Sequence, residues 1–219
     1  MNWLKETIVL LRKEILLEWR MKYALSGILL YVFSTIFIVY TAFIRLQPNV
    51  WNTLFWIIVL FASVNAIVKS FVQENSARQL YYYSIANPIA ILLSKIIYNA
   101  VLLLLLSVLC WIGLSIVAVN PVKDTGQFVG AIFLASVGFS ITFTFVSAIS
   151  AKADNSATLM AVMSFPLVIP ILMTLIKISA NALRLLNDTS VYKDVLMLVG
   201  IDLLLLGLAL VLYPFLWKD

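Results

Sequence analysis

Few side chains in this chain are capable of acid–base, nucleophilic or metal chemistry. None of the 219 residues is histidine, which excludes imidazole metal sites, histidine-based catalytic triads and histidine-ligated haem within the chain. The single cysteine, Cys110, cannot form an internal disulfide, and we expect it to pack as a small apolar side chain. No G-x-x-x-x-G-K-S/T motif occurs, so ATP hydrolysis by the usual phosphate loop is excluded. We therefore expect no catalytic residue, no metal site and no directly bound cofactor.

Asp202 is the most informative ionisable residue, because it lies inside a long apolar run near the C-terminus. A carboxylate at the centre of a membrane costs about 2.5–3.5 kcal/mol, so it should face protein or water and find a partner. Lys177 is the partner that the sequence offers. The alternative is that the last helix begins near Val199, which would leave Asp202 close to the outer headgroups.

The longest polar segment between apolar runs is 69–88, and it carries a second group of candidate functional residues. Glu74 and Arg78 have the i,i+4 spacing and polarity that stabilise a short helix. Tyr81 and Tyr82 follow them, and Asn87-Pro88 ends the helix. The tyrosines are explained either by an aromatic belt at the headgroups or by a helix that docks a cytoplasmic partner.

Two prolines, Pro166 and Pro170, interrupt the fifth apolar run. Each removes an i→i−4 hydrogen bond, which kinks the helix. An ordinary bend is one interpretation; we favour a built-in hinge, because the two prolines lie four residues apart.

The composition requires that helices in a bilayer position these residues. Hydrophobic residues make up 63% of the chain and charged residues 11%, with a mean hydropathy of +1.07. In soluble domains roughly 45–50% of residues are hydrophobic and roughly 25% are charged. Six runs are long enough to span a membrane, which needs about 20 apolar residues. The expected spans are Tyr23–Ile44, Trp51–Val68, Ile89–Val119, Phe128–Ile149, Thr158–Ile176 and Val195–Trp217. The predicted fold is all-α, with a six-span domain over residues 23–219.

The distribution of Lys and Arg predicts the orientation. Ten of the 15 cations fall on the side of the termini, and five on the other. The ten are Lys5, Arg12, Lys13, Arg20, Lys22, Lys69, Arg78, Lys95, Lys152 and Lys218. The positive-inside rule then places both termini, and the segment 69–88, in the cytoplasm. We attribute the net charge of +5 to this topology and to anionic lipids, not to nucleic-acid binding.

Residues 1–22 precede the first span and predict an amphipathic helix at the interface. Leu4, Ile8, Leu11, Ile15 and Trp19 recur at helical spacing and form one apolar face. Arg12, Glu14 and Arg20 lie among the charged residues of the other face. The helix is either a lipid anchor or an element that also contacts a cytoplasmic subunit, which its acidic residues favour.

Three stretches of the chain resemble the CcmB family, the permease subunit of the cytochrome c maturation (haem exporter) ABC transporter. The stretches are Arg12 to Arg20, Phe71 to Asn87-Pro88 with Ser94-Lys95, and Phe165 to Pro170. The resemblance covers essentially the whole chain. It departs at Ser76–Tyr81, where family members often carry a glycine followed by Leu-Glu.

The resemblance implies a bacterial inner-membrane permease of the ABC-2 exporter type. A separate cytoplasmic ATP-binding subunit would dock on Glu74, Arg78, Tyr81 and Tyr82. Other membrane subunits of the maturation complex, and indirectly a haem chaperone, are further implied partners, and a two-fold homodimer is an expected arrangement. Haem would be cargo of the complex, and ATP would bind the partner. Because histidine is absent and the tryptophans are scattered along the sequence, we expect a mechanical role: coupling ATP hydrolysis to haem delivery or to release of the loaded chaperone.

Two other classes of transporter remain open at the level of sequence. An ABC-2 permease for a lipid or another small hydrophobic substrate would have the same pattern. An ion-coupled secondary transporter would need several intramembrane ionisable residues, of which the chain offers essentially Asp202.

Overall fold

The computed structural model describes residues 3–20, 22–43, 46–67, 87–151, 156–186 and 191–216. Every regular element in these ranges is an α-helix. The helices are α1 (Trp3–Arg20), α2 (Lys22–Ala42), α3 (Pro48–Ile67), α6 (Pro88–Val117), α7 (Thr125–Ser150), α8 (Ser156–Ala182) and α9 (Val191–Leu216). The all-α prediction is confirmed.

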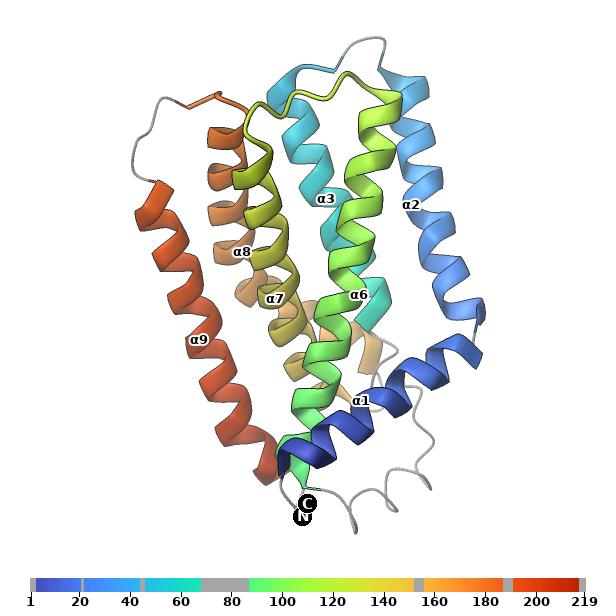
Figure 1. The fold of residues 1–219 in the computed structure, drawn as a ribbon, viewed down its shortest axis with the longest axis vertical. Coiled ribbons are helices and arrows are strands. Elements are labelled where there is room, and N and C mark those ends of the chain that lie inside the picture. Colours follow the sequence, from blue (N-terminus) through green and yellow to red (C-terminus); the bar gives the residue numbers. More distant parts are fainter. Residues whose placement is uncertain are drawn as a thin grey trace.

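Six of these helices run side by side as a bundle, and α1 lies obliquely across one end of it (Figure 1). We call this the α1 end, and the other the opposite end. The start of α1 and the last turn of α9 both lie at the α1 end (Figure 1). Five helices are long and apolar enough to cross a membrane, namely α3, α6, α7, α8 and α9. The apolar stretch of α2, Ser26–Ala42, is shorter, so a count of six spans stays a prediction.

The exterior of the bundle is apolar, as a lipid-facing surface requires. Side chains such as Leu30, Phe37, Phe133 and Val162, from three different helices, are more than half exposed. A monomer in water rarely exposes so continuous an apolar surface. The described helices thus form an integral, multi-pass membrane protein.

The centre of the bundle is α7, which contacts α3, α6, α8 and α9. From Ser140 to Ala148 every side chain of α7 is buried. Alternation of small hydroxyl residues with phenylalanine allows this, since Ser and Thr permit close helix approach and return their hydroxyls to backbone carbonyls. Thr142, for example, donates to the Gly138 carbonyl at 2.8 Å.

The opposite end is held by hydrogen bonds at the start of α7 and the end of α8. Asp124 caps α7 by accepting from the Gln127 N–H at 3.0 Å. The backbone N–H groups of Lys123 and Asp124 donate to the carbonyl of Ala182, the last residue of α8. Arg184 ends this turn in the left-handed region, with φ of 56°. The connection between α6 and α7 is thereby fixed to the end of α8.

Candidate functional site

Asp202 is buried in the middle of α9, with 5% of its surface exposed. Because α9 begins at Val191, the carboxyl lies roughly 16 Å into the helix at 1.5 Å per residue. The alternative in which the helix starts near Val199 is therefore wrong. Oδ1 of Asp202 has no hydrogen-bond partner among the described residues.

The predicted pairing of Asp202 with Lys177 is also wrong. Lys177 donates to Asp194 Oδ1 at 3.0 Å, near the opposite end of the bundle. The earlier start of α9 explains the difference, because it brings Asp194, not Asp202, level with the last turns of α8.

Asp202 packs instead against Gly138 of α7. A Cβ added at Gly138 would lie 2.5 Å from Asp202 Oδ1 and 3.1 Å from its Cγ. Small residues allow helices to approach in this way. Gly130, eight residues earlier on α7, has nothing within 4 Å of an added Cβ and is exposed. Close packing therefore requires a glycine at Gly138 and not at Gly130.

Polar contacts that the sequence analysis did not anticipate join α6 and α7 in the interior. Asn99 donates to Thr144 Oγ1 at 2.8 Å, and Ser140 donates to the Ile96 carbonyl at 2.6 Å. Ser136, Ser140 and Thr144 recur at intervals of four, a spacing that marks one face of a helix and was the available signal. These contacts fix the register of α6 against α7.

An aromatic cluster closes the opposite end of the bundle. Trp51 stacks on Phe55 with ring centroids 5.7 Å apart, and Phe128 lies 5.4 Å from Trp111. Trp56 meets Phe55 edge-on at 5.0 Å. The tryptophans are scattered in sequence, yet three of the six, from α3 and α6, meet here. The sequence analysis missed this because the contacts join residues far apart in the chain.

Two hydrogen bonds fasten α3 to α8 beside this cluster. The indole N–H of Trp56 donates to Ser179 Oγ at 2.7 Å, and Asn52 donates to the Ile176 carbonyl at 3.1 Å. Both donors are buried. The two helices are thus pinned together at the opposite end.

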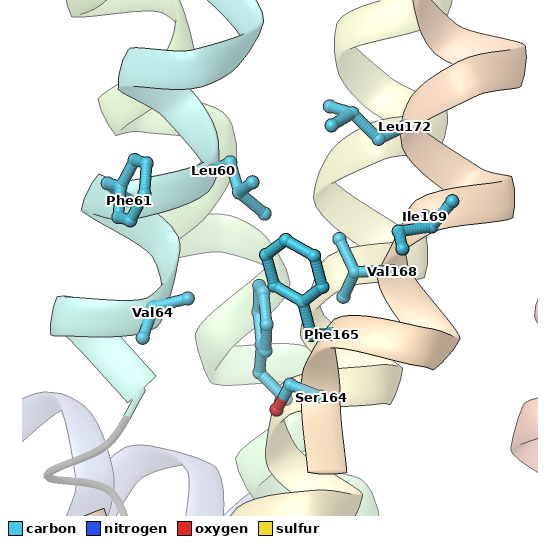
Figure 2. A pocket seen from close by; sticks show the side chains of 9 residues that line it. Leu60, Phe61, Val64, Ser164, Phe165, Val168, Ile169 and Leu172 are labelled. Atoms are coloured by element: carbon cyan, nitrogen blue, oxygen red, sulfur yellow. The ribbon is translucent and has the colours of Figure 1, made fainter. Parts of the chain in front are cut away.

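Toward the α1 end, a groove lies between the same two helices (Figure 2). It has a cavity volume of about 110 Å³. Phe165 and Val168 point from α8 toward α3, where Leu60 lies (Figure 2). Its lining residues are Leu60, Phe61, Val64, Phe143, Ser164, Phe165, Val168, Ile169 and Leu172. The lining is apolar except for Ser164, whose hydroxyl donates to the Met160 carbonyl at 2.6 Å.

The two prolines lie in the groove-lining part of α8. Pro166 and Pro170 are both inside the helix, which continues through them from Ser156 to Ala182. One turn beyond them, the Thr174 hydroxyl donates to the Pro170 carbonyl at 2.8 Å. The prolines therefore weaken α8 beside the groove and below the pinned junction with α3, although a hinge motion stays a prediction.

The helix at the N-terminus lies against α6, and its acidic side chains bind within the chain. Glu14 Oε1 lies 3.4 Å from Lys95 Nζ, and Glu6 Oε2 accepts from the Asn87 N–H at 3.2 Å. The acidic residues were taken as a sign of contact with a cytoplasmic subunit, but these two contact α6. Lys95 was counted with the cations of the cytoplasmic side, within the expected span Ile89–Val119; it lies inside α6, where it is 2% exposed.

The remaining predicted site residues are only partly described. Arg12 is exposed on α1. The side chains of Trp19 and Arg20 lie outside the described part of the chain, as do Glu74, Arg78, Tyr81 and Tyr82. The segment that contains these four joins α6 directly at Asn87.

The described residues make mainly packing contacts and present few reactive groups. Among them, no group of three or more Cys, Asp or Glu side chains could hold a metal ion. Cys110 is buried in α6 with 1% exposure, as expected for a packing residue. The arrangement has one pinned end, one end with a groove and an oblique helix, and a buried carboxyl between them.

Such a bundle defines a class: the helical, multi-pass membrane proteins. The chain belongs to the CcmB family, because the family model described as CcmB protein matches residues 5–216. It is accordingly a permease-type membrane component of a cytochrome c maturation haem exporter, an ABC transporter with an ATPase and other Ccm subunits. Comparison with curated proteins and with solved structures finds no match.

Proposed function

We propose that this chain is the mechanical permease of the exporter. It couples ATP hydrolysis on a separate cytoplasmic subunit to haem delivery or to release of the haem-loaded chaperone. Neither ATP hydrolysis nor haem ligation is assigned to the chain itself, which has no phosphate loop and no histidine. Membership of the CcmB family is the observation that carries this proposal.

The difference between the two ends of the bundle supports a mechanical role. At the opposite end, Trp56 and Asn52 hold α3 to α8. At the α1 end the same helices are separated by the groove, and α8 contains two prolines there. A force applied at the α1 end would move the half of α8 nearest that end relative to α3. The junction held by Trp56 and Asn52 would act as the pivot. Hinge motions of this kind need few residues to change conformation.

The test is capture of the ATPase by the purified permease. Reversing both charges of the predicted docking helix in the segment 69–88, with Glu74→Lys and Arg78→Glu, is expected to weaken capture about tenfold or more, because like charges then oppose the partner's surface. The matched control is the exposed pair at the opposite end, with Lys177→Glu and Asp194→Lys, which should leave capture unchanged. Undiminished capture by the reversed Glu74 and Arg78 variant would contradict the proposed docking segment.

The groove favours one second candidate, export of a lipid or another small hydrophobic molecule. Its apolar lining opens sideways, with Phe165 62% exposed and Phe61 49% exposed. A hydrophobic cargo could enter such a groove from the bilayer. Introduction of a charge by Val168→Asp should abolish that export, whereas ATP-dependent cytochrome c maturation that survives the change would exclude the groove as a cargo route.

A further inference from the structure

Lys95 is a buried cation whose position on α6 needs an explanation. It lies about 10 Å along the helix from Pro88 at 1.5 Å per residue, and 2% of it is exposed. A lysine so deep in an apolar helix is costly unless it is paired. Its carboxylate partner, Glu14, comes from α1 and not from the bundle.

The Glu14 side chain is itself mostly buried, with 15% exposed. Its Oε1 atom also lies 3.5 Å from Lys13 Nζ, so two cations neutralise it. About two turns earlier, Thr7 is 7% exposed on the same side of α1. These residues form the face by which α1 is pressed onto α6.

A second contact fixes α1 to the first residue of the same helix. Glu6 Oε2 accepts from the Asn87 N–H at 3.2 Å. Asn87 is the N-cap of α6, and its side chain accepts from the Ile89 N–H at 3.0 Å. The N-terminus of α6 is therefore capped by Asn87, which is in turn held by α1.

The face of α1 that points away from α6 is apolar and exposed. Ile8 is 66% exposed, Val9 65% and Leu16 59%. These side chains suit the acyl boundary of the bilayer. What attaches α1 specifically to α6 is therefore the polar face, and above all Glu14 with Lys95.

We propose that Lys95 is a positioning residue for energy coupling: with Glu14, and with Glu6 on Asn87, it clasps α1 to the first turns of α6. The clasp makes α1 and the start of α6 one rigid unit, so that a displacement delivered at Asn87 moves α6 within the bundle instead of bending its first turn. This inference rests on the proposed function, because it concerns how that displacement is passed on.

The test uses the whole complex, with variants that break and restore the clasp. Lys95→Glu should lower cytochrome c formed per ATP hydrolysed about tenfold, within the range of usual coupling energies, while ATP hydrolysis itself persists. Adding Glu14→Lys re-forms the pair with reversed charges and should restore the ratio. Glu14→Gln is the milder break, for use if Lys95→Glu does not accumulate. A purely structural role would lower the amount of complex and leave the ratio per complex unchanged.

Docking of α1 is read separately through thiol labelling in detergent. A cysteine at Thr7 should be protected in the wild-type background, labelled in Lys95→Glu, and protected again in the charge-swapped pair. A cysteine at Ile8 is the matched control and should be labelled in all three. Protection of the Thr7 site in Lys95→Glu, or failure of the swap to restore coupling, would overturn the clasp.

Failure of the clasp is distinguishable from failure of the proposed function. If the wild-type chain does not capture an ATPase, or maturation proceeds with a hydrolysis-dead ATPase, the mechanical role itself is wrong. If wild-type coupling is normal and Lys95→Glu leaves the ratio unchanged, only the clasp is wrong.

Discussion

At the scale of single residues, Asp202 and Gly138 depend on one another. The carboxyl occupies the space where a side chain on Gly138 would begin, and its Oδ1 gains no hydrogen bond from a described residue. The presence of a buried carboxyl was predictable, because no other acid lies so deep in an apolar run. Its neighbour was not, since the contact depends on the register of α9 against α7.

Gly138→Ala should therefore destabilise the bundle by about 1–3 kcal/mol, because the new methyl group forces the Asp202 carboxyl to move. Thermal unfolding in detergent measures this change. Gly130→Ala is the control and should be neutral or mildly stabilising, since its site is open. In an Asp202→Ala background the cost of Gly138→Ala should largely vanish; an unchanged cost would show that the carboxyl is not the obstacle.

The two ion pairs illustrate what sequence reasoning at the residue scale can reach. Lys177 was expected to pair with Asp202, but its partner is Asp194, which the start of α9 at Val191 places beside it. Lys95 was used in the sequence analysis only as a sign of the cytoplasmic side, because charges usually lie outside apolar helices. The acid that allows Lys95 to be buried is Glu14, which lies 81 positions away in the sequence. The docking of α1 on α6 brings the two together.

At the scale of elements, apolar length predicted the helices well, and their ends less well. The expected Ile89–Val119 and Phe128–Ile149 correspond closely to α6 and α7. The fifth run was expected to stop at Ile176, yet α8 continues to Ala182, and Lys177 pairs with Asp194 within its last turns. The α3–α8 groove and the aromatic cluster arise from packing between helices, which periodicity within one helix does not encode.

Replacement of the α8 prolines tests the hinge. Pro166→Ala restores a backbone N–H in the helix interior and should raise resistance to unfolding by up to about 3 kcal/mol, while lowering cytochrome c maturation. Pro214→Ala, in α9 and away from the groove, is the matched control and should leave maturation unchanged. Wild-type maturation in Pro166→Ala/Pro170→Ala would show that α8 only bends.

At the scale of the whole molecule, the positions of the helix ends agree with an even number of crossings. The first turn of α1 and the last turn of α9 share one end of the bundle (Figure 1). The side of the membrane on which that end lies is a separate matter, which the distribution of Lys and Arg predicts to be the cytoplasm.

Site-directed thiol labelling in intact spheroplasts tests this orientation. A cysteine at Val119, which is 93% exposed between α6 and α7, should react with an impermeant maleimide without lysis. A cysteine at Lys5, exposed on α1, should react only after lysis. The native Cys110 is 1% exposed and should stay silent in both. The reverse pattern would place the segment at 69–88 on the wrong face for a cytoplasmic ATPase.

The aromatic cluster also gives the molecule an optical label of its own. Indole rings from α3 and α6 surround the same two phenylalanines at one extremity of the bundle, close enough for excitation to pass between them. Their emission depends on how those rings are spaced and shielded. A nucleotide added to the complex that changed this emission would therefore signal that movement had travelled the full length of the helices, without any dye attached to the protein.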